Sequence, residues 1–232
     1  VHLLYNENSD NWMGSFNIEN YYKSGKWYIK NVYLTDVADN SSYYYLYENY
    51  STENYVLYNP KTQSYTVTDI AFAEFNVSGT QPDLIPPRLE SISIEPEYIN
   101  INGKAVIKAE FIEEDSGMDY TSILLYSPAK YDDDTNKGIS KSISLTYEPH
   151  LGLWAGAINI KKHYQSGMWT LHKIYAIDEA GNIIEYMYDK EADKKNYMLR
   201  KNPKTLLHTD IPVQTLRIRG TDPDLTPPEL KS

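Results

Sequence analysis

The chain has 232 residues, a net charge of −10 and no cysteine. The acidic balance argues against nucleic-acid binding, which depends on Lys and Arg neutralising phosphates. The lack of cysteine excludes disulfides, zinc–thiolate sites and thiol nucleophiles, and no apolar run is long enough to predict membrane insertion.

The first 82 residues form a partial copy of the remainder of the chain. Residues 12–40 match residues 154–182 at 12 of 29 positions, and Val1-x-Leu3-x-Tyr5 aligns with Ile143-x-Leu145-x-Tyr147. Both matches have an offset of 142 residues, which indicates a tandem repeat of one structural unit. Because residues 1–82 contain no counterpart of roughly residues 89–142, we expect an incomplete first unit.

A tyrosine-rich run lies within this first unit, and the whole chain contains 23 Tyr. Tyr43, Tyr45 and Tyr47 would share one face of a strand. Tyrosine rings offer rigid contact area at low entropic cost, so the run predicts a binding surface for a sugar or a peptide. The alternative is an edge strand whose outer face is covered by the next loop of the chain. The matching stretch of the second unit, residues 183–188, keeps fewer tyrosines.

Proline-rich segments punctuate the chain. Residues 79–87 match residues 220–228 as Gly-Thr-x-Pro-Asp-Leu-x-Pro-Pro. Because proline fixes φ and removes a backbone donor, such a segment predicts a stiff junction. We therefore expect a partial repeat over residues 1–82, a complete repeat over 83–224 and the start of another repeat over 225–232, in a fragment of a longer protein. The junction aspartates Asp83, Asp222 and Asp224 are alternative ion ligands.

The second unit is a series of strands separated by turns. Apolar residues alternate with polar ones, which is typical of strands with one buried face. Between Trp169 and Ile177 this alternation changes phase, which predicts a β-bulge or a strand that crosses between two sheets. The expected strands are Leu89–Ile94, Lys104–Ile112, Ser122–Tyr126, Ile139–Tyr147, Trp154–Ile160, Trp169–Ile177, Ile183–Tyr188 and Val213–Ile218, with long loops around Pro128–Gly138 and Asp189–Pro212.

The strand pattern predicts an all-β fold class, with tandem Ig-like β-sandwich repeats joined by Pro-rich junctions. An acidic loop lies at the end of one predicted strand and holds Glu113, Asp115 and Asp119. Carboxylate oxygens on an irregular loop suit calcium, and Asp178 would join them if its turn lies at the same end of the sandwich. The alternative is a solvated loop, with Asp178 capping its own turn.

Three motifs resemble the bacterial Ig-like tandem repeats of large secreted or cell-surface, adhesin-type proteins. They are Asp115-Ser116-Gly117-Met118, Ser166-Gly167-x-Trp169, and Asp178-x-Ala180-Gly181-Asn182. The resemblance implies an extracellular or cell-surface stalk or adhesive module without catalysis. Its partners would be neighbouring repeats of the same chain and a protein or glycan ligand. The alternative is an accessory or carbohydrate-binding module of a secreted protease or glycoside hydrolase.

Overall fold

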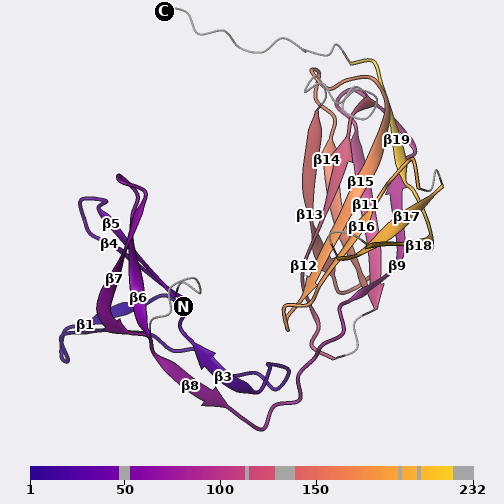
Figure 1. Ribbon diagram of the computed structural model, residues 1–232. Coiled ribbons are helices and arrows are strands. Elements are labelled where there is room, and N and C mark those ends of the chain that lie inside the picture. Colours follow the sequence, from indigo (N-terminus) through magenta and orange to yellow (C-terminus); the bar gives the residue numbers. More distant parts are fainter. Residues whose placement is uncertain (47–52, 113–114, 129–138, 193–194, 203–204, 222–232) are drawn as a thin grey trace, which may run out of the picture. The chain divides into compact units, whose positions relative to one another are not determined.

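Figure 1 shows the computed structural model, which describes residues 1–46, 53–112, 115–128, 139–192, 195–202 and 205–221. The chain divides into two compact units, which we call unit 1 (Val1–Pro82) and unit 2 (Asp83–Ser232). Strands make up both units, which confirms the all-β class.

Unit 2 contains eleven strands in one hydrogen-bonded sheet. Its main path runs β18-β17-β16-β15-β12-β13-β14-β11-β9, while β19 pairs with β10 and β15. The strands are β9 (Arg88–Glu95), β10 (Tyr98–Asn100), β11 (Lys104–Ile112), β12 (Met118–Tyr126), β13 (Ser140–Glu148), β14 (Leu153–Asn159), β15 (Gly167–Asp178), β16 (Ile183–Met187), β17 (Asn196–Asn202), β18 (Thr205–Pro212) and β19 (Thr215–Arg219).

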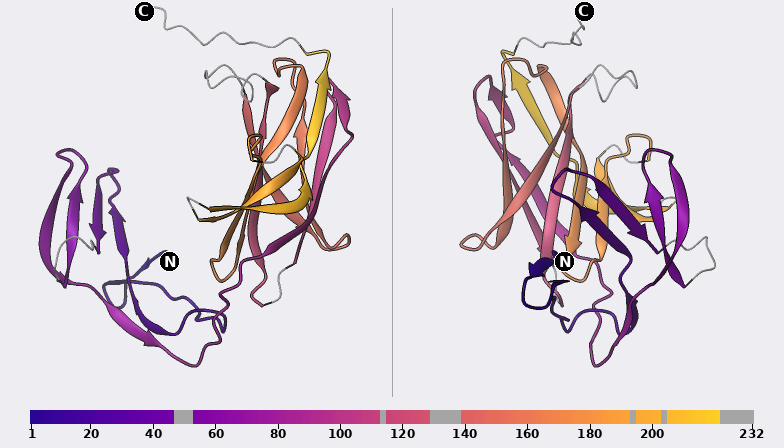
Figure 2. Two further views of the ribbon diagram at one scale, coloured as in Figure 1. Left: turned by 45° about the vertical axis from the view of Figure 1, so that its right-hand side comes forward. Right: turned by 90° about the vertical axis from the view of Figure 1, so that its left-hand side faces the viewer.

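The two views of Figure 2 show that this sheet curls, and the buried side chains of its strands form one apolar core. Its two ends, β9 and β18, line opposite sides of a pocket, so the sheet is almost closed on itself. A sandwich of two separate sheets was expected, but β13 pairs with both β12 and β14 and makes the sheet continuous.

The predicted alternation places the core of unit 2. Ala105, Ile107 and Ala109 of β11 are buried on one face, and Ile123 and Leu125 of β12 join the same cluster. Burying such side chains is the main favourable contribution to folding. The period-two pattern was therefore enough to predict which faces turn inward.

The phase change in β15 is a β-bulge. Leu124 of β12 lies opposite Lys173, but the next residue, Leu125, lies opposite Leu171. His172 is the extra residue, and beyond it the buried positions shift from the parity of Trp169 to that of Ile174. The structure thus confirms a bulge as the origin of the pattern.

The expectation of a long loop over Asp189–Pro212 is wrong. β17 and β18 pair as antiparallel strands in this stretch, with Leu199 opposite Leu207 and Met198 opposite His208. Tyr197 is fully buried, and its hydroxyl donates to the Leu171 carbonyl at 3.0 Å. The sequence did not reveal this strand, because the apolar Met198 lies between Tyr197 and Leu199 and interrupts the alternation of apolar and polar residues.

Unit 1 forms three smaller sheets. β1 pairs with β2, β3 pairs with β8, and β4-β5-β6-β7 is a four-stranded meander. The strands are β1 (Leu4–Asn6), β2 (Asn11–Met13), β3 (Gly25–Tyr28), β4 (Asn31–Thr35), β5 (Ser41–Tyr45), β6 (Asn54–Asn59), β7 (Ser64–Ala71) and β8 (Glu74–Val77).

The strand registers of unit 1 recur in unit 2. Tyr5 lies opposite Trp12 as Tyr147 lies opposite Trp154. The β3–β8 pair repeats in β15–β19, and the β4-β5-β6-β7 meander repeats in β15-β16-β17-β18. A Cβ added at Gly14 would clash with Val1 and Leu3, and one at Gly156 with the equivalent Ile143 and Leu145.

Side-chain hydrogen bonds repeat as well. The Trp27 indole donates to the Lys23 carbonyl at 2.7 Å, and the Trp169 indole donates to the Gln165 carbonyl at 2.8 Å. The Tyr55 hydroxyl donates to the Ile29 carbonyl at 2.8 Å, as Tyr197 does to Leu171. The two units therefore share one local construction over the part of the repeat that both contain.

Candidate binding surface

A row of tyrosines crosses the four-stranded sheet of unit 1. Tyr33, Tyr43, Tyr58 and Tyr65 are direct cross-strand partners on β4, β5, β6 and β7. Ring centroids lie 5.5 Å apart for Tyr33–Tyr43 and 4.9 Å apart for Tyr58–Tyr65. Tyr45 lies two residues from Tyr43 on the same face, 6.0 Å from Tyr33 and 6.4 Å from Tyr58. We call these five residues the tyrosine row.

The tyrosine row is open to solvent at both ends. Tyr33 and Tyr65 are 57% and 39% exposed, whereas the three rings between them are half-buried. Partial burial, together with the neighbouring phenol of Tyr33, raises the pKa of Tyr45. The surface carries hydroxyls at the edges of apolar rings.

The sequence predicted part of this surface. Tyr43 and Tyr45 lie on one face of β5 as expected, and Tyr47 lies outside the described residues. Sequence reasoning missed Tyr33 and Tyr65, because cross-strand register brings them to the same face. The β6–β7 hairpin, which places Tyr58 opposite Tyr65, turns through Asn59 and Gln63, and Gln63 has a φ of 53°.

The same positions in unit 2 carry different chemistry. The counterparts of Tyr33, Tyr43, Tyr58 and Tyr65 are Tyr175, Glu185, Arg200 and Leu206. There, Glu185 forms ion pairs with Arg200 at 3.1 Å and with Lys173. One unit thus presents aromatic rings where the other presents a charged network on the same strands.

The acidic residues predicted to bind calcium do not gather among the described residues. Asp115 and Asp119 are exposed, and Glu113 lies outside the described part of the chain. Asp178 is buried, and its two carboxylate oxygens accept hydrogen bonds from the Asn182 backbone and side-chain amides at 2.7 and 2.9 Å. In the ranges that the structure describes, no group of three or more His, Asp or Glu is placed to hold a metal ion. Calcium binding therefore stays a prediction.

Asp83 of the first proline-rich segment has a structural role. Its buried carboxylate accepts hydrogen bonds from the Ser116 hydroxyl at 2.6 Å and the Ile85 amide at 2.9 Å. Its carbonyl accepts from the Asn182 side chain at 3.2 Å. We call Asp83, Ser116 and Asn182 the polar clasp, because they join the junction, the loop of the Asp115-Ser116-Gly117 motif and the Asp178–Asn182 turn.

The chain passes between the units over a short stretch. The Gln81 amide donates to the Asn20 carbonyl at 2.7 Å within unit 1, and Asp83 belongs to the polar clasp of unit 2. Pro82 alone separates these two anchored residues.

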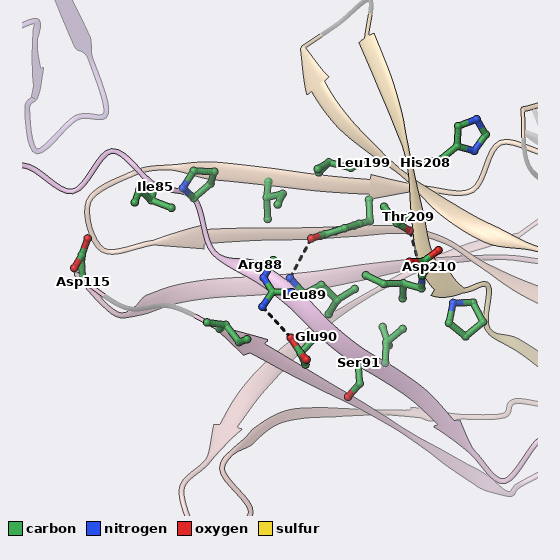
Figure 3. Close-up of a pocket in the computed structure, with 17 residues that line it drawn as sticks. Ile85, Arg88, Leu89, Glu90, Ser91, Asp115, Leu199, His208, Thr209 and Asp210 are labelled. Carbon is green, nitrogen blue, oxygen red and sulfur yellow. Dashed lines mark hydrogen bonds and ion pairs between the residues drawn. The ribbon is translucent and has the colours of Figure 1, made fainter.

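A pocket of about 760 Å³ lies in unit 2 between the two ends of its sheet. Figure 3 shows its aliphatic wall, to which Ile85 and Leu89 contribute, and its polar rim. At the rim the Arg88 guanidinium pairs with Glu90 at 3.2 Å, while the Tyr186 hydroxyl accepts a hydrogen bond from the Leu89 amide at 3.1 Å. The pocket is thus mainly an apolar seam.

Comparison of the chain with protein-family models, curated proteins and solved structures gives no match. Within the described residues, no helix has the length and apolarity needed to cross a bilayer.

Proposed function

We propose that this chain is a non-catalytic repeat region of an exported bacterial surface protein, in which Ig-like units act as a stalk and the tyrosine row provides an adhesive surface. The observation that carries the proposal is the difference between two units with the same strand registers. A surface that only stabilised the fold would be expected in both, whereas the tyrosine row occurs in unit 1 alone.

The chemistry of the row favours a glycan as its ligand. The faces of sugar rings carry C–H groups that pack on aromatic rings, and phenol hydroxyls at the ring edges can bond sugar hydroxyls. Tyrosine also loses little conformational entropy on binding. Such a surface binds without a deep cavity, as suits the face of a sheet.

The repeat construction supports the stalk. The Pro-rich junction is bonded to unit 2 through the polar clasp and to unit 1 through Gln81, so few residues are free of both folds. A series of such units would project a binding face away from its anchor. In this proposal the neighbouring repeats of the same chain are structural partners.

The second candidate function is a carbohydrate-binding module of a secreted glycoside hydrolase or protease. The same tyrosine row favours it, because the geometry of sugar stacking is independent of what the surface is attached to. A catalytic domain in the same polypeptide would distinguish this candidate from an adhesin.

A glycan array tests the adhesive surface. The full chain should bind one class of glycan, and Tyr33→Ala should weaken that binding by roughly threefold to tenfold, because a stacked ring contributes about 0.5–1.5 kcal/mol. Tyr175→Ala is the matched control, since Tyr175 occupies the equivalent strand position of unit 2. It should leave binding unchanged.

Equal binding by the wild-type chain and Tyr33→Ala would contradict the assignment of the row. Circular dichroism of both variants verifies that the fold is retained.

A further inference from the structure

Three strand edges in unit 1 lack the partners that their counterparts have in unit 2. In unit 2, β12 lies between β15 and β13, and β11 pairs with the outer edge of β14. In unit 1 the counterpart of the β15 segment beyond the bulge is β4, that of β13 is β1 and that of β14 is β2. Among the described residues, β4 pairs only with β5, and β1 and β2 pair only with each other. Unpaired edges of this kind are templates for another strand.

The apolar face between these edges is open. Leu3, Phe16 and Leu34 of unit 1 are 44%, 51% and 48% exposed, whereas the equivalent Leu145, Ile158 and Ala176 of unit 2 are 3%, 4% and 0% exposed. The equivalents of these large side chains lie together in one core cluster, so their exposure in unit 1 is not the scattered kind that surfaces tolerate.

Unit 2 shows what covers the equivalent face. Leu145, Ile158 and Ala176 belong to one core cluster with Ile107 of β11 and Ile123 of β12. Both strands lie within residues 83–142, which is the part of the repeat for which unit 1 has no counterpart. The same segment pairs with the three edges and buries the face.

We propose that unit 1 is a strand acceptor. Its exposed apolar side chains and unpaired edges would bind a further segment equivalent to residues 83–142. The register comes from unit 2, where Ile123 lies opposite Ile174 and Ile143. In the filled unit 1, the residue equivalent to Ile123 would lie opposite Val32 and Val1. Backbone pairing with an edge provides affinity, and alternate side chains entering the core provide specificity.

The added strand would also change the sheet of unit 1. In unit 2, β12 pairs along β15 on both sides of the bulge, and β15 is continuous over Gly167–Asp178. In unit 1 the equivalent stretch is divided into β3 and β4. Filling the site would join β3 and β4 into one strand and unite three sheets into one.

Pairing with a second copy through β4 would not produce this result. It would extend one edge but leave Phe16 and Leu3 uncovered, because the segment that buries their counterparts is folded into the partner's own unit 2. The segment of residues 83–142 satisfies the edges and the face together.

The test fuses a second copy of residues 83–142 directly before Val1 of the full chain. This position keeps the repeat register, because Val1 is equivalent to Ile143. The segment contains no tryptophan, so fluorescence still reports only on Trp12, Trp27, Trp154 and Trp169. We expect amide exchange of β4 to slow by about tenfold or more. Quenching by acrylamide should decrease as Trp27 becomes buried and Trp12 partly buried, as their equivalents Trp169 and Trp154 are.

The matched control carries Ile123→Asp and Leu125→Asp in the added copy alone. It should restore the exchange rates of the unfused chain. The same isolated segment, added in trans to isotopically labelled chain, should shift the amide signals of Asn31–Thr35. Unchanged exchange and quenching in the fusion would overturn the proposal, as would concentration-dependent self-association of the unfused chain that protects β4 equally.

Discussion

Single side chains explain how the proline-rich junction becomes part of a folded unit. Asp83 is buried, and each of its hydrogen bonds connects it to a segment far away in sequence or to its own turn. Buried polar groups are stabilising only while their partners remain. The polar clasp therefore explains the Asp of the Pro-Asp-Leu motif.

Removing this carboxylate should destabilise unit 2. In Asp83→Ala the Ser116 hydroxyl and the Ile85 amide lose their acceptor, at a cost of about 1–3 kcal/mol. Urea denaturation, followed by amide exchange of unit 2, measures the loss. Asp83→Asn keeps one acceptor oxygen and should lose less. In the double variant with Ser116→Ala, the two effects should be less than additive, and an unchanged midpoint for Asp83→Ala would show that the clasp contributes nothing.

At the scale of whole strands, the two units differ in the side chains that connect neighbouring strands. β15, β16 and β17 are connected on their outer face by Lys173, Glu185 and Arg200. Partial burial opposes ionisation of Glu185, but the hydrogen bonds from Lys173 and Arg200 outweigh it and lower the pKa of its carboxyl below 4.5. The equivalent strands of unit 1 are connected by tyrosine rings.

Acid should weaken this connection in unit 2. Because the folded-state pKa of Glu185 is lowered, its contribution is fully present above the unfolded value of about 4.5 and is lost as the pH falls through the folded value. We expect Glu185→Gln to lower the melting temperature at neutral pH, and the difference from wild type to shrink toward about pH 3.

Glu90→Gln provides the control, because its pair with Arg88 is exposed and such pairs contribute little. A difference between Glu185→Gln and wild type that stays constant with pH would contradict the assignment.

A comparison of individual strands shows what could be predicted from the sequence. Lys104–Ile112 was predicted with the bounds that β11 has, because a clean alternation encodes a half-buried strand. The β17–β18 hairpin was missed, since its alternation is interrupted and its strands are rich in polar residues. Tyr43 and Tyr45 of the tyrosine row were predicted on β5, whereas Tyr33 and Tyr65 required cross-strand register, which a local pattern does not contain.

The whole chain contains two units with very different cores. In unit 1 the buried apolar side chains among the described residues are Tyr55, Val56 and Val77, whereas one cluster of unit 2 extends through nearly all its strands. Since stability is a small difference between burial and conformational entropy, the two units should not unfold together.

Calorimetry should therefore show two transitions, with unit 1 melting first. Hydrogen exchange identifies which unit opens: β4 to β7 should exchange at temperatures that leave β11, β12 and β15 protected. A single transition with equal calorimetric and van't Hoff enthalpies would show that the chain unfolds as one cooperative body.

The single proline between Gln81 and Asp83 has a consequence for how such chains can be rearranged. A genetic crossover at this codon would preserve the hydrogen bonds of both anchors, since Gln81 bonds backward along the chain and Asp83 bonds forward. Duplication, deletion or shuffling of modules at this point would keep each anchor with the unit to which it is bonded. A break a few codons later would instead separate Asp83 from the loop and turn that hold it.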